Sequence, residues 1–495
     1  MKTKLTTLGL ALLILTIKAC SPEKKKPIAT QDPFIYDKIT PVNFPKVNVP
    51  NFKFPEDSTT LNEWIRKNDT LKIYTHGWGI WAGLTQPTSQ TAGGQNLLVF
   101  ETWLTPEEMI DSILQKPNKR SNRANLKRPN QFTHFGHTVN DSIHESVSYS
   151  PSAANHAIKN KLFLASSLYQ YAKQGKTEIP IFPDDAITIK PVFKILPVSK
   201  AKDQKLFAIS TWPGTIDSLA AFPEKDWHSA VYIDITNHSH GDGNQLYFPN
   251  STTPPEPTAA TTYDLSDFIH YTMNKEDAHF FNQEFTENTS NPMTANPGDI
   301  VILVGMHVNS RENTRWTWQT FWWVADPDNP VAPSSQAIAN QRPKALTHAA
   351  SHYAMAVAYY MINPEEPNNG INIQGNPNYA FNPYLEAGFG PDVFNKKISQ
   401  ITTAKKDTIP TYAGVRTNCM SCHSMATVNP DALNTSKNSS TPYIGDAYIP
   451  LNDSIFTGQL KLDFAWSIQG NIDTTGFKTL IKKYTNTLEN NTIQE

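Results

Sequence analysis

The sequence predicts an α+β fold, in which a β-rich body with interspersed helices precedes a short C-terminal segment. Short runs of β-branched and aromatic residues recur through most of the chain, whereas helix start signals are fewer and well separated. The chain has 495 residues, which is enough for a large core. Its formal net charge is −2 and 18% of its residues are charged, so it lacks the basic surface that nucleic-acid binding requires.

Six runs of residues are expected to form strands. In the last of them, Trp316, Trp318 and Trp322 alternate with other residues and therefore share one face of the strand. Tryptophans in this arrangement are typical of core packing. The six runs cover residues 96–103, 187–196, 206–212, 230–235, 300–308 and 315–324.

Three helices are expected. Thr105 and Pro106, followed by two acidic residues, predict a helix from residue 106 to about 115. The Ser150–Pro151 pair predicts a longer helix that ends near Gly175. A third helix is expected from about residue 346 to residue 362, where an Asn–Pro pair stops it.

The N-terminus has the pattern of an export signal. Residues 1–19 begin with Lys2 and Lys4, continue with an apolar run and end in an alanine, and they are expected to be a signal peptide. Cys20 follows that alanine and resembles the lipobox cysteine of bacterial lipoproteins, although Lys18 departs from the usual pattern. Acylated Cys20 would hold the chain on a lipid bilayer. An ordinary secretory anchor with a free Cys20 is the alternative.

Proline-rich stretches divide the rest of the chain. Residues 20–57 are expected to be an extended tether, and residues 58–342 the β-rich body. A Pro- and Thr-rich stretch leaves open a joint between two subdomains near residues 250–260. Residues 343–495 form the expected C-terminal region.

The most specific motif lies in this C-terminal region. Cys419, Cys422 and His423 form a C-x-x-C-H pattern, which is typical of covalent attachment of one c-type haem. Two thiols at this spacing can bond the two vinyl groups of one porphyrin, and the histidine can then bind the iron. The only other cysteine in the sequence is Cys20, so no second C-x-x-C is present to complete a zinc site. A thioredoxin-like dithiol is the alternative, but no strand-like run precedes the motif.

The ligand on the other side of the iron is not given by the motif. After His423 the sequence contains no histidine, and Met425 is too close along the chain to reach the opposite face of the ring. The predicted helix over residues 346–362 would place two histidines and a methionine on one face, and those histidines also suit zinc without an evident third ligand. Either the iron is five-coordinate, or its sixth ligand is one of four residues: His352, Met355, His348 or His307.

Five segments together resemble a group of large bacterial envelope proteins with a single C-x-x-C-H, identified as the cytochrome c family. The resemblance implies haem binding and electron transfer, and it implies no substrate. The segments are residues 303–308, 315–323, 382–387, 419–423 and 463–467.

The sequence therefore predicts a membrane-tethered c-type cytochrome with one covalent haem that transfers electrons in the cell envelope. It would be lipid-anchored and either periplasm-facing or in the outer membrane, and its redox partner protein is not identified. The body is several times larger than a carrier needs, which leaves two alternatives open. One is a haem-dependent oxidoreductase or peroxidase that acts on a small molecule, and the other is a haem-based ligand-binding or sensor module. No catalytic residue is assigned.

Overall fold

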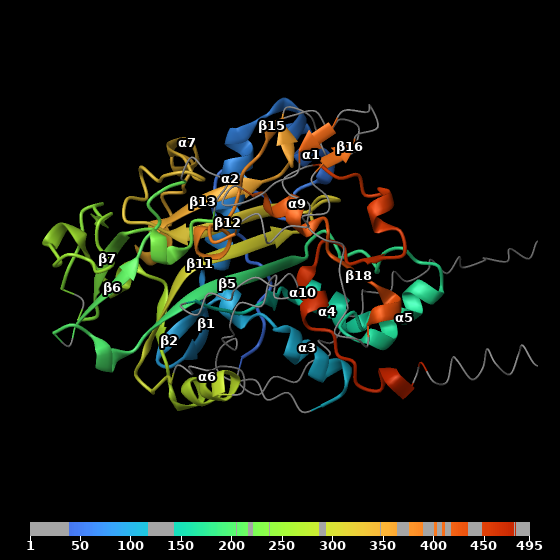
Figure 1. Ribbon diagram of the computed structural model, residues 1–495, viewed down its shortest axis with the longest axis horizontal. Helices are drawn as coiled ribbons and strands as arrows, with labels where there is room; N and C mark the ends of the chain where they lie inside the picture. Colours follow the sequence, from blue (N-terminus) through green and yellow to red (C-terminus); the bar gives the residue numbers. More distant parts are fainter. Residues whose placement is uncertain are drawn as a thin grey trace, which may run out of the picture. The chain divides into compact units, whose positions relative to one another are not determined.

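The structure is a computed structural model (Figure 1) that describes most of the chain after the N-terminal 38 residues. The predicted signal peptide, Cys20 and the first part of the predicted tether therefore lie outside the described residues. The described residues are 39–481 without 117–142, 204, 216–220, 237, 287–293, 347, 364–375, 390–399, 403–407, 411–416, 434–447 and 480.

An antiparallel sheet of seven strands organises the body and confirms the predicted α+β class. Its long central strands, β5 (Ile187–Leu196), β11 (Ile300–Ser310) and β12 (Thr317–Trp323), coincide with three of the predicted runs. They cross the middle of Figure 1. Shorter strands complete the sheet: β13 (Tyr353–Ala358) beside β12, β10 (His270–Thr272) beside β11, and β3 (His144–Glu145) and β4 (Ser148–Tyr149) beside β5.

A second, four-stranded sheet lies between β5 and β10 in the sequence. Its central strand β7 (Ser229–Asp234) pairs with β6 (Leu206–Ser210), β8 (Leu246–Tyr247) and, in parallel, β9 (Thr262–Asp264). The prediction of a subdomain joint near residues 250–260 is wrong. Those residues link β8 to β9, and both strands pair with β7, so the proline-rich stretch is a loop within one sheet.

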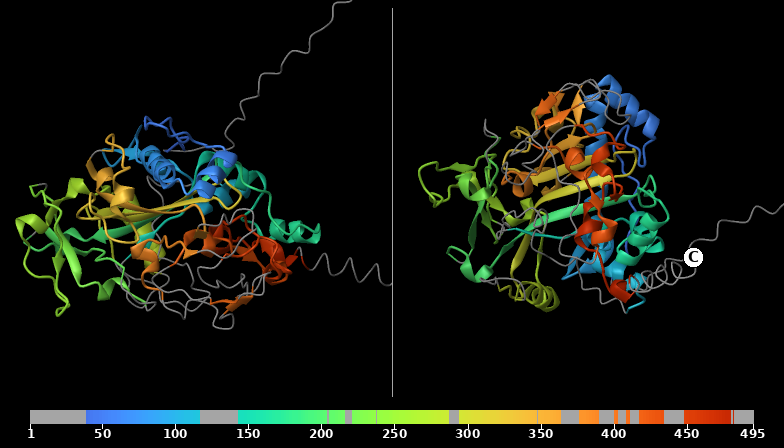
Figure 2. Two further views of the ribbon diagram at one scale, coloured as in Figure 1. Left: turned by 90° about the horizontal axis from the view of Figure 1, so that it is seen from above. Right: turned by 45° about the vertical axis from the view of Figure 1, so that its right-hand side comes forward.

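Two helices that the sequence analysis did not anticipate cover one face of the large sheet. They are α1 (Ser58–Lys67) and α2 (Thr70–Leu84), each with an aspartate as N-cap. Trp81 of α2 stacks on Phe321 of β12 with ring centroids 4.4 Å apart. Figure 2 (left) shows α1 and α2, in blue, on one side of the sheet and the orange and red C-terminal elements on the other.

Residues 39–57 form an extended strap that packs on the body, so the prediction of a tether as far as residue 57 is wrong in this part. Phe52 and Phe44 lie against Gly79 and Gly83 of α2, where a Cβ atom would come within 2.1 Å and 2.2 Å of their rings. The two glycines thus let the strap approach the helix backbone. The indole nitrogen of Trp103 also donates to the carbonyl of the strap residue Val42, over 2.8 Å.

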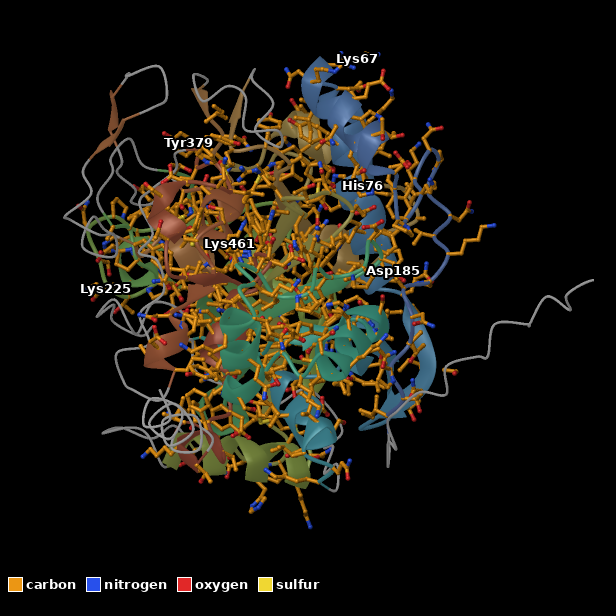
Figure 3. All side chains as sticks on the ribbon, turned by 90° about the vertical axis from the view of Figure 1, so that its right-hand side faces the viewer. Lys67, His76, Asp185, Lys225, Tyr379 and Lys461 are labelled. Atoms are coloured by element: carbon orange, nitrogen blue, oxygen red, sulfur yellow. The ribbon has the colours of Figure 1, made fainter. Side chains whose placement is uncertain are left out.

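A buried polar network fixes the end of the strap to α2 and to the sheet. His76 of α2 bonds through Nδ1 to the hydroxyl of Tyr359 (2.6 Å) and through Nε2 to Oε1 of Glu312 (3.1 Å). The same Glu312 oxygen accepts the backbone N–H of Glu56 (2.6 Å). The side chains of His76 and Glu312 are essentially inaccessible to solvent. Figure 3 shows His76 on α2.

One helix prediction is confirmed and two are wrong. The helix α3 (Pro106–Ile113) has the expected cap at Thr105. The long helix predicted to end near Gly175 is two helices, α4 (Pro151–Lys159) and α5 (Ala165–Lys173). The chain leaves α4 through Lys161, whose φ is +52°, and Leu164 then bridges to a C-terminal residue.

The helix predicted over residues 346–362 does not form. A short 3₁₀ turn (His348–His352) leads instead into β13, which pairs with the tryptophan-rich strand β12 along its whole length. Pairing with this neighbouring strand overrides the helical spacing of the apolar residues. Consequently the division at residues 342/343 is also wrong, because β13 belongs to the same sheet as the body, and the described residues form one compact unit.

The remaining elements are short. The predicted run 96–103 is only half strand, since β2 ends at Leu98 and a 3₁₀ turn follows. None of the helices in the described part of the chain is long and apolar enough to cross a membrane. The other helices and strands are β1 (Pro87–Ala92), β2 (Gln95–Leu98), α6 (Lys275–Thr286), α7 (Gln336–Ala339), β14 (Ile362–Asn363), β15 (Asn376–Pro377), α8 (Pro383–Glu386), β16 (Gln400–Thr402), β17 (Thr408–Pro410), α9 (Cys419–His423), β18 (Thr427–Val428), β19 (Leu460–Lys461) and α10 (Trp466–Gly470).

The packed strap predicts a specific effect of Gly79→Ala. The new methyl group would overlap the ring of Phe52, and overpacking of this kind costs about 1–3 kcal/mol, which should lower the Tm measured by thermal unfolding. In a Phe52→Ala background the same substitution should be neutral or stabilising, because alanine is the better helix former by ~1 kcal/mol. An unchanged Tm for the single variant would contradict the packing of the strap on α2.

Candidate haem-attachment site

The five-residue helix α9 carries the C-x-x-C-H motif and is held in place by its N-cap, Asn418. The Asn418 side chain donates to the carbonyls of Asn378 (2.5 Å) and Tyr360 (3.3 Å), which follow β13 in the chain. The backbone N–H of Cys419 donates to the carbonyl of Ala380, over 3.2 Å. Backbone groups on two other segments therefore set the position of the motif, which lies over β12 on the sheet face opposite α2.

A cavity of about 330 Å³ lies beside α9 and is lined by residues of both α9 and the sheet. This volume is at the lower end of the range for small-molecule pockets. The register of the strands puts the sheet residues of its wall on one face, since His307 pairs with Lys190 and Asn309 pairs with both Thr188 and Trp318. The facing wall includes all three residues of the motif, Cys419, Cys422 and His423.

Neither motif cysteine is in a disulfide, and both line this cavity. The Cys419 thiol donates to the carbonyl of Ala380 (3.1 Å). Burial raises the pKa of both thiols well above the ordinary value, and the carboxylate of Glu386 raises it further. Reactive dithiols have a lowered pKa, so this environment disfavours the thioredoxin-like alternative.

His423 is held as a neutral ring with one nitrogen available to a metal. Its Nδ1–H donates to the carbonyl of Phe464 (2.8 Å), and its ring packs against Trp318 with centroids 4.2 Å apart. Burial lowers the pKa of His423 to about 3, so the imidazole is uncharged at neutral pH. Among the described residues none hydrogen-bonds to Nε2. This is the arrangement of a metal-binding histidine, whose second nitrogen donates to a carbonyl or carboxylate.

The carbonyl of Phe464 belongs to a strained turn. Asp463 and Phe464 have φ values of +44° and +66°, which cost roughly 1–3 kcal/mol each for residues other than glycine. The Asp463 carboxylate secures the turn by accepting bonds from Nε of Arg311 (3.2 Å) and from the indole nitrogen of Trp316 (3.2 Å). Both donors come from the loop between β11 and β12, so the sheet itself holds the turn that orients His423.

Of the four residues proposed as the sixth ligand, His307 is the one that lines the cavity with the motif. Its Nε2 lies 2.9 Å from Oε1 of Glu386. The other oxygen of Glu386 accepts the backbone N–H of Asn382 (2.7 Å), at the start of α8. The sequence analysis did not single out Glu386. The available signal was a helix-capping asparagine, Asn382, followed four residues later by Glu386. This signal does not indicate the contact between Glu386 and His307, because the two residues are far apart in the sequence.

The other three candidates lie elsewhere. Met355 is buried on the α2 face of the sheet, where its sulfur would lie 2.8 Å from a Cβ atom at Gly77. His352 is stacked on Trp323 and lies 3.5 Å from Asp267. His348 is exposed in the 3₁₀ turn. The shared helix face predicted for these three residues does not exist, because the helix does not form. In the described part of the chain, no three His, Cys, Asp or Glu side chains cluster as for a metal ion, so the zinc alternative gains no support.

Comparison of the chain with protein-family models, with curated proteins and with solved structures found no match. Two thiols and a neutral imidazole with a free Nε2 face one cavity, and this donor set fits covalently bound haem.

The buried ion pair beneath the site predicts the effect of Asp463→Ala. Removing this carboxylate leaves the buried Arg311 uncompensated, which costs about 3–5 kcal/mol and should lower the Tm of the protein. Asp431→Ala is the matched control, because it breaks an exposed pair with Lys173 that is worth about 0–1 kcal/mol. Equal Tm values for the two variants would contradict the role given to the turn.

Proposed function

We propose that this protein is a lipid-anchored c-type cytochrome that carries one covalent haem and transfers electrons in the cell envelope. The observation that carries the proposal is the hydrogen bond from His423 Nδ1 to the Phe464 carbonyl, beside two thiols that face the same cavity. It leaves Nε2 of His423 as the nitrogen that would bind iron.

Each residue of the site has a distinct part in this proposal. Cys419 and Cys422 would form the two thioether bonds, and His423 would be the axial ligand of the iron. The carbonyl of Phe464 fixes the orientation of the imidazole and increases its basicity as a ligand. Trp318 packs on the ring and excludes water from that side. Bound here, the haem would supply one-electron redox chemistry.

The N-terminal pattern supports the proposed location. Acylation of Cys20 would tether the chain to a bilayer, facing the periplasm or at the outer membrane. Haem c is attached outside the cytoplasm in bacteria, so an export signal and a C-x-x-C-H motif in one chain agree with each other. The redox partner protein is not identified by any feature of the described residues.

One observation favours a second candidate function, in which the haem binds or transforms a small molecule. The sheet wall of the cavity is polar and includes Lys190, His307 and Asn309. The polarity and hydrogen-bond donors of such a wall decide between ligand binding and simple electron transfer. A haem-dependent oxidoreductase or peroxidase, or a haem-based sensor, would use this wall.

Haem attachment can be tested with the wild-type chain and two variants, produced in a bacterium that matures c-type cytochromes. The wild-type chain should keep its haem stain after denaturation, because thioether bonds survive unfolding. The Cys419→Ala/Cys422→Ala variant cannot form these bonds and should lose the stain. Cys20→Ala should keep the haem but lose membrane association, which separates the two modifications. A wild-type chain without stain, with both thiols open to alkylation, would contradict the proposal.

A further inference from the structure

Resting on the proposed haem, we infer that Asp463 is a positioning residue that sets the reduction potential of the site. Its carboxylate would act through the Phe464 carbonyl on the basicity of His423, the proposed iron ligand. Three observations carry the inference: the bonds that the carboxylate receives, the backbone strain that gathers around it, and the contacts that its chain segment makes with α9.

The Asp463 carboxylate is buried and receives hydrogen bonds from two other parts of the chain. The residue is only 2% exposed. Its Oδ1 accepts the indole N–H of Trp316 (3.2 Å), and its Oδ2 accepts Nε–H of Arg311 (3.2 Å). Oδ2 also accepts the backbone N–H of Phe182 (2.9 Å), a residue that precedes β5. A buried polar group that is fully satisfied in this way is held rigidly, and so is the backbone that carries it.

Backbone strain gathers at the same carboxylate. Trp316, which donates to it, has a φ of +60°, and Asp463 and Phe464 have φ values of +44° and +66°. A positive φ is a genuine outlier for a bulky residue such as tryptophan or phenylalanine. Strain of this kind persists only where the surrounding structure enforces it, and it clusters at functional sites. The strained residues thus form a continuous path from the β11–β12 loop to the carbonyl that holds His423.

The segment that carries Asp463 lies along α9. Three of its residues form hydrogen bonds with α9 or with the turn that follows it, and only the middle bond reaches the side chain of His423. The three bonds join Leu462 to Ala426 (2.9 Å), Phe464 to His423 (2.8 Å) and Trp466 to Cys422 (3.0 Å). The outer two would keep the segment beside α9 if the strained turn relaxed. The bond to His423 is therefore the one that depends on Asp463.

The direction of the effect follows from ligand chemistry. A hydrogen bond from Nδ1–H to an acceptor makes an imidazole a more basic ligand, which stabilises ferric iron more than ferrous iron. A weaker bond to the Phe464 carbonyl therefore favours reduction and raises the potential. Removal of the carboxylate charge would act in the same direction through electrostatics alone. A charge-neutral substitution distinguishes the two causes.

Redox titrations of the purified haem protein test this inference with two substitutions. Asp463→Asn removes the charge together with the anchor of the turn, whereas Trp316→Phe removes one bond to the carboxylate and leaves the charge. Asp463→Asn should change the equilibrium constant for reduction about tenfold, which raises the potential by ~59 mV for one electron. Trp316→Phe should raise it less. In both variants the proton on Nδ1 of His423, followed by NMR, should exchange faster with solvent, which reports the hydrogen bond directly.

Trp78→Phe is the matched control for the loss of an indole hydrogen bond. Trp78 is fully buried, and its indole nitrogen donates to the carbonyl of Ile338 (2.8 Å). It belongs to α2, on the face of the sheet opposite α9 (Figure 2). This substitution should lower the Tm but leave the potential and the proton exchange unchanged. If Asp463→Asn does not fold, Trp316→Phe decides the matter, because it leaves the buried Arg311 paired.

The outcomes separate the two proposals. A protein without covalent haem overturns the proposed function. With the haem attached, three results overturn only the role of Asp463: a potential that neither substitution changes, a rise in Asp463→Asn that is absent from Trp316→Phe, or an equal rise in Trp78→Phe. The second result would assign the effect to charge alone, and the third to a general loss of packing.

Discussion

The hydrogen bond from His423 to the carbonyl of Phe464 is the constraint on which the rest of the site depends. It determines which imidazole nitrogen is free, and it requires a backbone turn with two consecutive positive φ values. That turn persists because Asp463 is bonded to Arg311 and Trp316 at one end of the large sheet. His423, the proposed iron ligand, is therefore positioned by the core of the protein and not by the five-residue motif alone.

The two faces of the large sheet have different roles: one packs under α2, and the other lines the candidate site. Along β11 and β12, alternate residues point in opposite directions, so neighbours in sequence serve different purposes. Phe321 packs under α2, whereas Trp318, three residues earlier, lies against His423. The face covered by α2 and the strap is closed by packing and by the His76 network, whereas the opposite face presents His307 and Asn309 to the cavity.

Much of the fold was predictable because it depends on local signals. The strands β5, β11 and β12 and the helix α3 have clear periodicity or caps, and the C-x-x-C-H motif is readable without a structure. The predictions are wrong where contacts between residues far apart in the sequence determine the local structure. The segment that forms β13 has helical spacing, but pairing with β12 makes it a strand. The sequence around Phe52 predicts a loose tether, because it does not show that Phe52 packs against Gly79. The role of Phe464 could not be predicted from its side chain, because its backbone carbonyl makes the hydrogen bond to His423.

Intact mass spectrometry of the mature chain, exported from a cell that assembles c-type cytochromes and then denatured, tests the central claim most directly. The claim predicts a polypeptide heavier by one haem, with the added mass located on the peptide that contains Cys419 and Cys422. A chain of unmodified mass in that peptide, obtained from cells in which a reference cytochrome c is fully matured, would contradict it.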